Sequence, residues 1–425
     1  MKIKDANVGI LEFIYAKGKL AVLFIQSKDE IKLEIMNIPQ NELDELIGLY
    51  IRSIDYLRKY INEGNTKYIS DAEMELKNLS TKMYAVLIPQ GINDIIKKMS
   101  LDYLIVIPHK QLHLLPFELL YDGDDYWGLK YTISKSFSLD LLRISLEKAK
   151  KRPKEFDLTS LLVANPNYNE KIGNYSLSFP MTEKEVNKIV NILKRYEAEN
   201  AAEVLWRDNA TEDRFVELAN SNKYGFIHFA GHAYWEGRDP WLSFLMFSGY
   251  TTRGGEARLH LSEIVSNMQF KANPLVVLSA CESGVTKTAA GDEIFGIVRG
   301  LLLTGATTMI MSNWAVNDYA ACDYMLEFYR HWLKGMPAAI ALREARIFIR
   351  KRSEEGFYGD PKISLLHWAA FTLFGDPFRQ IKLLKEPKTK IKQLSEVPAE
   401  DTTARGIILR GLPKTDEGYF ENKKI

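Results

Sequence analysis

Short apolar runs and longer amphipathic runs alternate along most of this chain. Near the N-terminus, apolar residues at every second position predict three strands that form a small antiparallel meander. The three runs are Gly9–Tyr15, Leu20–Gln26 and Glu30–Met36. Apolar residues at helical spacing then predict two helices, one from Pro39 to about Ile61 and one from Ala72 to Leu87. These helices are expected to pair and to cover the sheet.

From Tyr103 onward the apolar runs become continuous, which is typical of strands buried on both faces of a parallel sheet. The predicted strands are Tyr103–Pro108, Ser160–Ala164, Gly225–Ala230, Leu275–Ser279 and Thr307–Met311. One predicted helix runs from a capping-box sequence at Thr182–Glu185 to about Arg195, and others follow Thr211, Gly291, Asn317 and Pro337. This alternation predicts an α/β fold with a mostly parallel sheet, helices on both faces, and chemistry beyond the carboxyl ends of the strands.

The change of pattern divides the chain into three expected parts. Residues 1–150 form an N-terminal α/β part with the meander and its helices, and residues 151–385 form the larger α/β part. Residues 386–425 contain few aliphatic clusters apart from Ile407–Leu409. This tail is expected to be either a mobile appendage or a strand donated elsewhere.

Composition narrows the class of protein without pointing to a function. The chain has 425 residues, 46% hydrophobic and 26% charged, which is typical of a soluble globular protein. Its 56 basic and 55 acidic residues leave a net charge of +1, so no global field favours nucleic acid or anionic lipid. No apolar run is long enough to span a membrane and no signal peptide precedes the first strand, so a cytoplasmic location is expected.

Two residues at predicted strand ends are the strongest candidates for chemistry. One apolar run stops at His232 and another stops at Cys281, each before a loop of small and polar residues. Parallel strands that end in histidine and cysteine place a base beside a nucleophile. An ordinary thiol is only a few per cent ionised at neutral pH, so a neighbouring imidazole would activate it. We therefore interpret His232 and Cys281 as a catalytic pair.

The remaining histidines and the second cysteine have structural interpretations. Cys322 lies within a helical apolar pattern and is expected to pack in the core, so a Cys322→Ser change should leave activity intact. His228 shares a strand face with His232 and either orients that imidazole or is a satisfied core histidine. The other histidines are His109, His113, His260, His331 and His367. They form no cluster at zinc-like spacing, and neither a catalytic metal nor a cofactor is expected.

The segments around these residues resemble the CHAT family of caspase- and separase-clan peptidases. The resemblance is carried by HFAGHA at His228–Ala233, LSACESG at Leu278–Gly284, the long segment Ala290–Asp318, and HWAAFTLFGDP at His367–Pro377. The spacing of the candidate pair, 281 − 232 = 49 residues, also matches the spacing of about 50 known for caspases. The resemblance implies a three-layer caspase-like sandwich, preceded by a smaller part that resembles a degenerate half of the same architecture.

By position in the motifs, the resemblance also assigns roles. His232 and Cys281 match the catalytic residues, and the main-chain N–H groups of Ala233 and Cys281 would form the oxyanion hole. The substrate pocket would be built from Asp292, Trp314, Ala315 and Asp318. Asp292 and Asp318 are equally suited to capping helices. Separases, which prefer arginine before the cut, have an acidic residue where this chain has Ala315, so a simple arginine preference is not expected.

The function that these observations predict is cysteine-type endopeptidase activity on a protein substrate. The family resemblance implies an enzyme held inactive until a protein partner, a self-complex or a processing event activates it, in bacterial defence or programmed death. The alternative is a catalytically silent caspase-like scaffold or sensor that binds partners. A nucleotide-binding module is disfavoured because neither a phosphate loop nor a dinucleotide fingerprint occurs.

Overall fold

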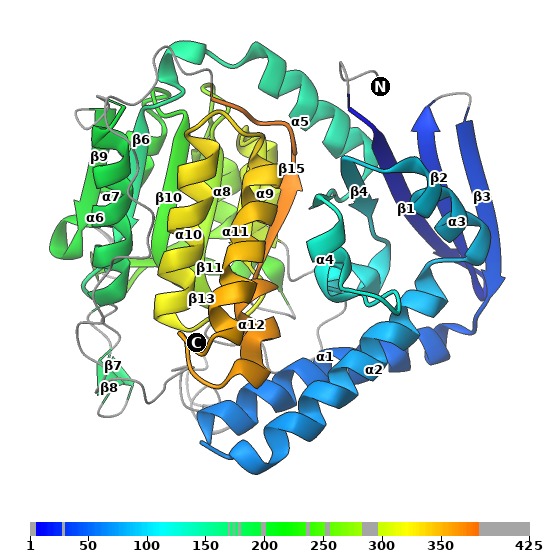
Figure 1. Ribbon diagram of the computed structural model, residues 1–425. Helices are drawn as coiled ribbons and strands as arrows, with labels where there is room; N and C mark the ends of the chain where they lie inside the picture. The colour runs from blue at the N-terminus through cyan, green and yellow to red at the C-terminus, as the bar shows by residue number, and fades with distance from the viewer. Residues whose placement is uncertain are drawn as a thin grey trace, which may run out of the picture.

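The computed structural model describes residues 6–27, 30–168, 171–172, 175–176, 180–196, 201–234, 239–250, 256–282 and 296–381. One 13-stranded sheet runs through this part of the chain (Figure 1). Its main path has the order β12-β11-β10-β13-β14-β15-β5-β4-β1-β2-β3. Two strands lie off this path: β6 pairs with β10, and β9 pairs with β6. A separate two-stranded ribbon consists of β7 (Lys171–Ile172) and β8 (Tyr175–Ser176).

The N-terminal half of the sheet contains the expected meander. The strands are β1 (Val8–Ala16), β2 (Lys19–Ser27), β3 (Glu30–Asn37), β4 (Tyr103–Ile107) and β5 (Ile133–Lys135). The helices are α1 (Gln40–Asn62), α2 (Ile69–Leu87), α3 (Gln90–Met99), α4 (Trp127–Lys130) and α5 (Leu139–Lys151). β1 pairs antiparallel with β2 and parallel with β4, so the meander extends a parallel ladder instead of forming a separate sheet.

The second half of the sheet carries the longer parallel ladder. Its strands are β6 (Ser160–Ala164), β9 (Ala202–Trp206), β10 (Phe226–Tyr234), β11 (Phe244–Tyr250), β12 (Glu256–His260), β13 (Leu275–Glu282), β14 (Thr308–Ser312) and β15 (Phe371–Gly375). Its helices are α6 (Pro180–Lys194), α7 (Glu212–Ala219), α8 (Leu261–Asn267), α9 (Gly296–Thr304), α10 (Asp318–Trp332), α11 (Ala338–Glu354) and α12 (Ser364–Trp368). β9, β6, β10, β13 and β14 form a run of strands that are mutually parallel.

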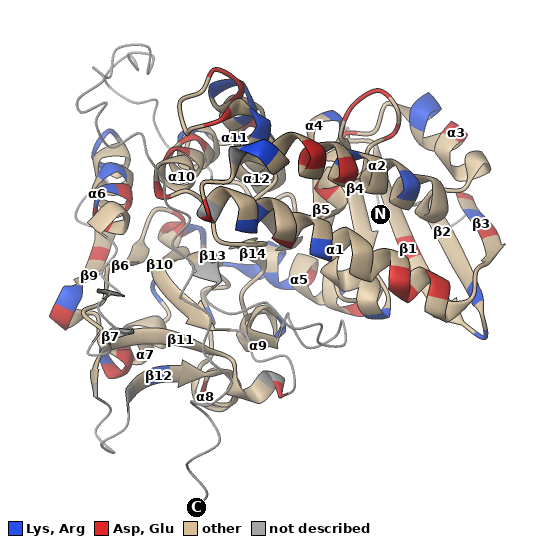
Figure 2. Ribbon diagram, turned by 90° about the horizontal axis from the view of Figure 1, so that it is seen from below, with Lys and Arg blue, Asp and Glu red and all other residues tan. Residues whose placement is uncertain are grey.

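Helices cover both faces of the sheet, which makes three layers (Figure 1). One hydrophobic cluster joins the sheet to α6, α10 and α11, and it continues under α1, α2 and α3. A second cluster joins the opposite face to α7, α8 and α9. Charged residues of both signs lie mainly on the helices, while the strands are mostly uncharged (Figure 2). No helix among the described residues is long and apolar enough to cross a membrane.

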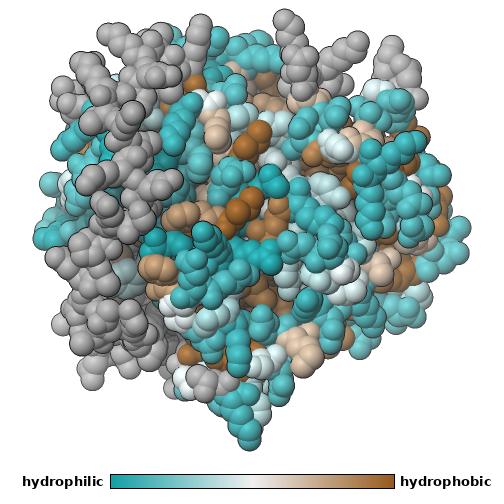
Figure 3. Space-filling view, viewed as in Figure 1, coloured by the Kyte–Doolittle hydropathy of each residue, from teal (hydrophilic) through white to brown (hydrophobic). Residues whose placement is uncertain are grey.

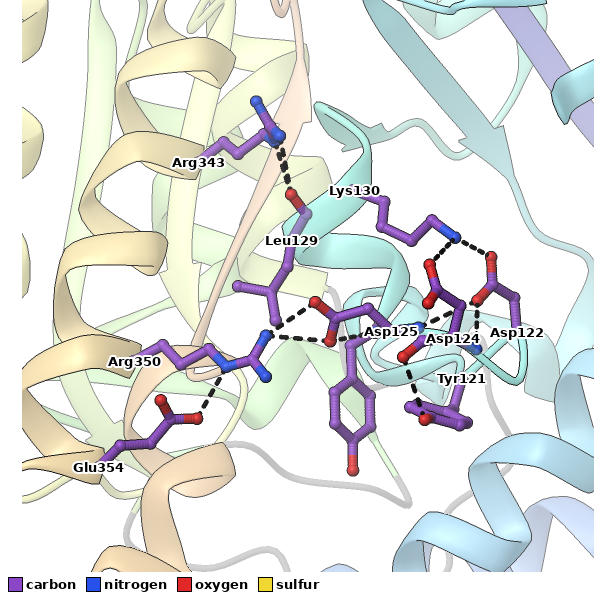
Figure 4. Close-up of polar contacts among 10 residues, drawn as sticks. Tyr121, Asp122, Asp124, Asp125, Leu129, Lys130, Arg343, Arg350 and Glu354 are labelled. Atoms are coloured by element: carbon purple, nitrogen blue, oxygen red, sulfur yellow. Dashed lines mark hydrogen bonds and ion pairs between the residues drawn. The ribbon is translucent and has the colours of Figure 1, made fainter. Parts of the chain in front are cut away.

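A row of arginines on α11 fastens the N-terminal half to the second half (Figure 4). Arg343 donates to the main-chain oxygen of Leu129 at 2.8 Å, and Arg350 binds the Asp125 carboxylate at 2.9 Å. Between them, Arg346 is 1% exposed and donates to the main-chain oxygens of Gly128 and Phe371 at 2.9 and 3.0 Å. β15 also pairs with β5, so the two halves share one sheet and one set of buried contacts.

The architecture confirms the predicted fold class, and most predicted elements are present. Strands beyond the predicted set are β5, β7, β8, β9, β11, β12 and β15. The helix predicted from a capping box at Thr182 begins earlier, at Pro180, so the capping-box interpretation is wrong. Glu185 is buried inside that helix and does not act at its terminus. The predicted tail, residues 386–425, lies outside the described residues, and the division at residue 150 stays a prediction.

Candidate active site

The two candidate catalytic positions lie side by side at the carboxyl ends of neighbouring strands. β10 and β13 are parallel and in register from Phe226 and Leu275 onward, and this register pairs His232 with Cys281. Neighbouring strands are about 4.8 Å apart, so the two main chains are adjacent at this point. The structure describes the backbone of Cys281. Two segments 49 residues apart in sequence (281 − 232 = 49) therefore converge at one point of the sheet.

Strand periodicity assigns both positions to the same face of the sheet. In β10, Phe226 and Ala230 belong to the cluster formed with α10 and α11, and in β13 Leu275 and Val277 belong to it. Because side chains alternate between faces, every second position along each strand belongs to this same side. His232 and Cys281 have the parity of that side in their strands.

Tyr168 holds the end of β10 in place around His232. The main-chain N–H of His232 donates to the Tyr168 hydroxyl at 3.0 Å, and the two rings lie 4.8 Å apart at a 60° tilt. Gly231 makes this approach feasible, because a Cβ there would lie 2.8 Å from the Tyr168 hydroxyl oxygen. Burial raises the pKa of Tyr168 above its ordinary value, so the phenol stays protonated. His232 itself is 4% exposed.

A buried polar network lies around His228, four residues before His232 in β10. His228 is fully buried, with one ring nitrogen 3.1 Å from the Tyr329 hydroxyl and the other 3.0 Å from a Glu185 carboxylate oxygen. The three residues come from β10, α10 and α6. Burial, with a smaller contribution from Glu185, raises the pKa of Tyr329 well above its ordinary value. The network therefore links the two helices on this face to the strand that ends in His232.

A small cavity lies between α6, α10 and the ends of β10 and β13. Its volume is about 20 Å³, which is enough space for a water molecule. It is lined by Met181, Thr182, Glu185, Gly231, Ser279, Asp318 and Ala321. Two acidic residues and two residues with hydroxyl groups thus line a cavity at the carboxyl edge of the strands that carry the candidate pair.

Of the predicted pocket residues, Asp318 lines this cavity, while Trp314 and Ala315 are buried nearby in the fold. Trp314 is 3% exposed, and its indole N–H donates to the main-chain oxygen of Leu366 at 2.8 Å. The cap of α10 is Asn317, whose side chain accepts from two main-chain N–H groups, so Asp318 is not the capping residue. Asp292 lies outside the described residues.

The second cysteine and the other histidines have structural contacts. Cys322 is fully buried in α10, and burial raises the pKa of its thiol to about 12. Burial lowers the pKa of His113 to about 3 and that of His367 to about 4, so both are neutral at pH 7. His109 accepts the main-chain N–H of Tyr15 at 2.8 Å. The residues that the structure describes contain no cluster able to hold a metal ion.

Glu185, Tyr168 and Ser279 were not predicted as parts of this site. A signal for Glu185 does exist in the sequence, because it shares a helical stripe with the buried Ile189 and Ile192. A carboxylate on an apolar stripe requires a buried polar partner, and here that partner is His228. Tyr168 lies in a loop between β6 and β7, where periodicity carries no information.

Comparisons with known proteins agree with this architecture. The CHAT domain family matches residues 77–376, which is most of the chain. No curated protein sequence matches the chain significantly. Two crystal structures of the Saccharomyces cerevisiae separase–securin complex match with TM-scores of 0.56 and 0.57, both at 11% identity. Each match covers 88% of this chain and 30% of the separase chain.

The fold is therefore of the caspase-like type found in separase, at an identity that supports the fold alone. The extent of the family match shows that this chain belongs to the CHAT domain family.

Proposed function

We propose that this chain is a cysteine endopeptidase in which Cys281 is the nucleophile and His232 is the general base. The observation that carries the proposal is the register of β10 and β13, which pairs these two positions at the carboxyl edge of the parallel ladder. Strand alternation assigns both positions to the same face of the sheet. That arrangement is what a Cys-His dyad requires.

The proposed reaction begins when the His232 imidazole takes the proton of the Cys281 thiol. The thiolate forms a bond to the peptide carbonyl carbon, and the carbonyl oxygen becomes an oxyanion held by the main-chain N–H groups of Ala233 and Cys281. The C–N bond then breaks, and His232 gives its proton to the leaving amine. Water attacks the resulting thioester with His232 as the base, which releases the carboxylic acid product and restores the thiol.

The described surroundings suit this chemistry. Tyr168 fixes the backbone of the strand end that carries His232. The His228 network, defined by Glu185, His228 and Tyr329, fixes the layer beneath it. We propose that substrate side chains bind near Asp318 at the mouth of the cavity, together with Asp292, Trp314 and Ala315. This assignment rests on position in the motif, and Asp318 is its best-supported member because it lines the cavity.

We propose further that a protein partner or a processing event controls the activity, in the cytoplasm and in bacterial defence or programmed death. The separase structures that match this fold contain securin, a second protein. The tail at residues 386–425 is a candidate for such control. In this proposal residues 1–150 support residues 151–385, which carry the dyad.

Two measurements test the proposal. The first is the rate at which a thiol-reactive electrophile labels Cys281 at neutral pH, which needs no knowledge of the substrate. The wild-type thiol should react faster than a free thiol, and His232→Ala should slow labelling to the rate of a free thiol. Cys322→Ser is the matched control and should leave the rate unchanged. The second is a peptide-library cleavage profile, with Cys281→Ala as the blank.

The outcomes separate the two candidate functions. Cleavage that disappears in both Cys281→Ala and His232→Ala, with a loss of at least about 100-fold, supports the dyad. Wild-type cleavage by either variant would remove the assignment. Labelling no faster than that of a free thiol, together with an empty library profile, would instead identify a catalytically silent scaffold.

A further inference from the structure

The outer strand of the N-terminal meander has its hydrophobic side toward solvent. On β3, Ile31, Leu33 and Ile35 are 56%, 50% and 58% exposed. They alternate along the strand and therefore share one face. The helix-covered side of the meander faces the viewer in Figures 1 and 3, and hydrophilic side chains make up most of the surface there. Three large aliphatic side chains in a row on one strand require an explanation.

Lys32 and Glu34 on β3 point the other way, toward the helices. A Cβ added at Gly91, at the start of α3, would contact the side chains of Glu34 and Lys32. Lys32 and Glu34 also pair with each other at 3.4 Å. An ordinary edge strand has its apolar residues toward the core and its polar residues toward water. From Ile31 to Ile35, β3 has the reverse arrangement, whereas Met36 packs against the core.

The exposure of β3 reflects a missing neighbouring strand more than a missing covering layer. On the same face of β2, Leu23 and Ile25 are half-buried, although they lie beneath the same solvent. β2 differs because it has a strand on each side, whereas β3 is the last strand of the path among the described residues. β3 is eight residues long and contains no proline, so it lacks two common devices that prevent strand addition.

We propose that β3 pairs antiparallel with β3 of a second copy of this chain, about a two-fold axis at Leu33. In that register Leu33 faces Leu33 of the second copy, and Ile31 faces Ile35 on the apolar side. On the helix side, Lys32 faces Glu34 of the second copy, and Glu34 faces its Lys32. Directly opposite charges and aliphatic pairs both favour strand pairing.

The sequence of β3 is self-complementary in this register, which is what a two-fold interface requires. A strand from an unrelated protein would have no reason to match the order of Lys32 and Glu34. The paired strands would join two sheets into one. β3 lies at the opposite end of the sheet from β10 and β13, so both candidate active sites stay clear of the interface.

Charge reversal tests the register with full-length protein in sedimentation velocity experiments. In the proposed register, position 32 of each copy faces position 34 of the other, so the dimer contains two such pairs. Lys32→Glu alone makes both pairs carboxylate–carboxylate, and Glu34→Lys alone makes both pairs ammonium–ammonium. Each single variant should raise the dimer dissociation constant about tenfold. An equimolar mixture of the two single variants should form heterodimers, and the double variant should recover wild-type association. Lys351→Glu makes the same change of charge on exposed α11 surface and should have no effect.

Disulfide trapping gives an independent test in a Cys281→Ala background. Leu33→Cys places two thiols directly opposite each other at a separation that a disulfide can span, so oxidation should yield covalent dimers. Ile35→Cys is the matched control, because its two copies would be four residues apart along the strands, about 13 Å. Circular dichroism confirms that each variant is folded.

A wild-type chain that stays monomeric at every concentration accessible to it would overturn the proposal. So would a dimer that is indifferent to both charge reversals, since that result would indicate packing through the face of the sheet or through another surface. Equal trapping of Leu33→Cys and Ile35→Cys would exclude the register. Because none of these results depends on peptide cleavage, the proposal stands or falls separately from the proposed function.

Discussion

The two halves of the sheet use the polar residues at their strand ends in different ways. In the N-terminal half, β5 ends at Lys135, which is 1% exposed and donates to the main-chain oxygens of Leu115 and His113 at 3.2 and 3.4 Å. His109, just beyond β4, accepts a main-chain N–H. These groups bind the backbone of their own chain and hold loops in place. Burial lowers the pKa of Lys135 to about 8, but its main-chain contacts are those of a structural residue.

In the second half, the corresponding groups meet one another beside a cavity. His228 contacts two other side chains, and Ser279, Glu185 and Asp318 line the space at the ends of β10 and β13. The difference suggests a rule for a fold whose two halves share one sheet. Polar residues bound to the main chain support the fold, whereas polar side chains gathered around a cavity are available for chemistry. The rule predicts which substitutions reduce stability and which reduce activity.

The largest expected effect on stability is at Arg346, in the row that fastens the halves together. Arg346→Met removes two hydrogen bonds to main-chain oxygens and the ion pair with Glu118 at 3.5 Å. The Glu118 carboxylate is fully buried and would lose this charge partner. The free energy of unfolding should fall by about 3–5 kcal/mol in urea denaturation. The control is Arg350→Met in the same row, a partly exposed pair that should lose at most about 1 kcal/mol. Equal losses would mean that burial is not what makes Arg346 important.

The next effect is a loss of stability in mild acid. The folded-state pKa values of His113 and His367, about 3 and about 4, lie below the ordinary value of 6.5. Between those values the unfolded chain binds protons that the folded chain does not, so stability falls as the pH falls below about 6.5. Unfolding free energies at about pH 7 and about pH 5 should differ by roughly 2 kcal/mol for each buried histidine.

Single substitutions apportion this acid sensitivity between the halves. His113→Gln removes the buried histidine of the N-terminal half, and His367→Gln removes the one in α12. In each variant the free energy of unfolding should fall less between about pH 7 and about pH 5. Each variant should remove about half of the difference attributed to the two residues. An acid limb that is unchanged in both variants would assign the sensitivity to other groups.

The smallest effect is expected at Cys322. Its thiol is fully buried, and a pKa of about 12 leaves almost no thiolate at pH 7. Cys322→Ser should reduce the free energy of unfolding by about 1 kcal/mol, because a hydroxyl replaces an apolar group in the core. Labelling of Cys281 should be unchanged. Loss of labelling in this variant would show that the wrong cysteine has been assigned.

The sequence predicted the fold class and the position of the candidate pair because both depend on local pattern. Continuous apolar runs identify buried parallel strands, and the residues at their ends can be counted directly, as with His232 and Cys281. β5 was not predicted because three residues are too few for periodicity to register, and β12 was not predicted because only Ala257 and Leu259 are apolar in it. β15 lies within the HWAAFTLFGDP motif and was not predicted as a strand, although three of its five residues are large and apolar.

The surroundings of the site were less predictable because they are assembled from separate segments. Tyr168, Glu185 and Tyr329 reach β10 from a loop and from two different helices. Nothing local relates their positions, since only the packing of α6 and α10 on the sheet brings them together. Trp314 is a further case, because no local pattern relates its indole N–H to the Leu366 main chain that it binds. Its predicted place in the substrate pocket stays a prediction.

The antiparallel β15 has a consequence for how this protein can be divided. It lies between β14 and β5, and Phe374 on it stacks on Phe137 at 5.3 Å. Expressing the C-terminal portion alone would strip one side of β15 of its hydrogen-bonding neighbour and uncover that aromatic ring. Such a truncated fragment would expose β15 as an unpaired edge strand and would be prone to aggregation. If the two portions are made as separate chains, they should therefore be co-expressed, so that β5 can pair with β15 as the chains fold.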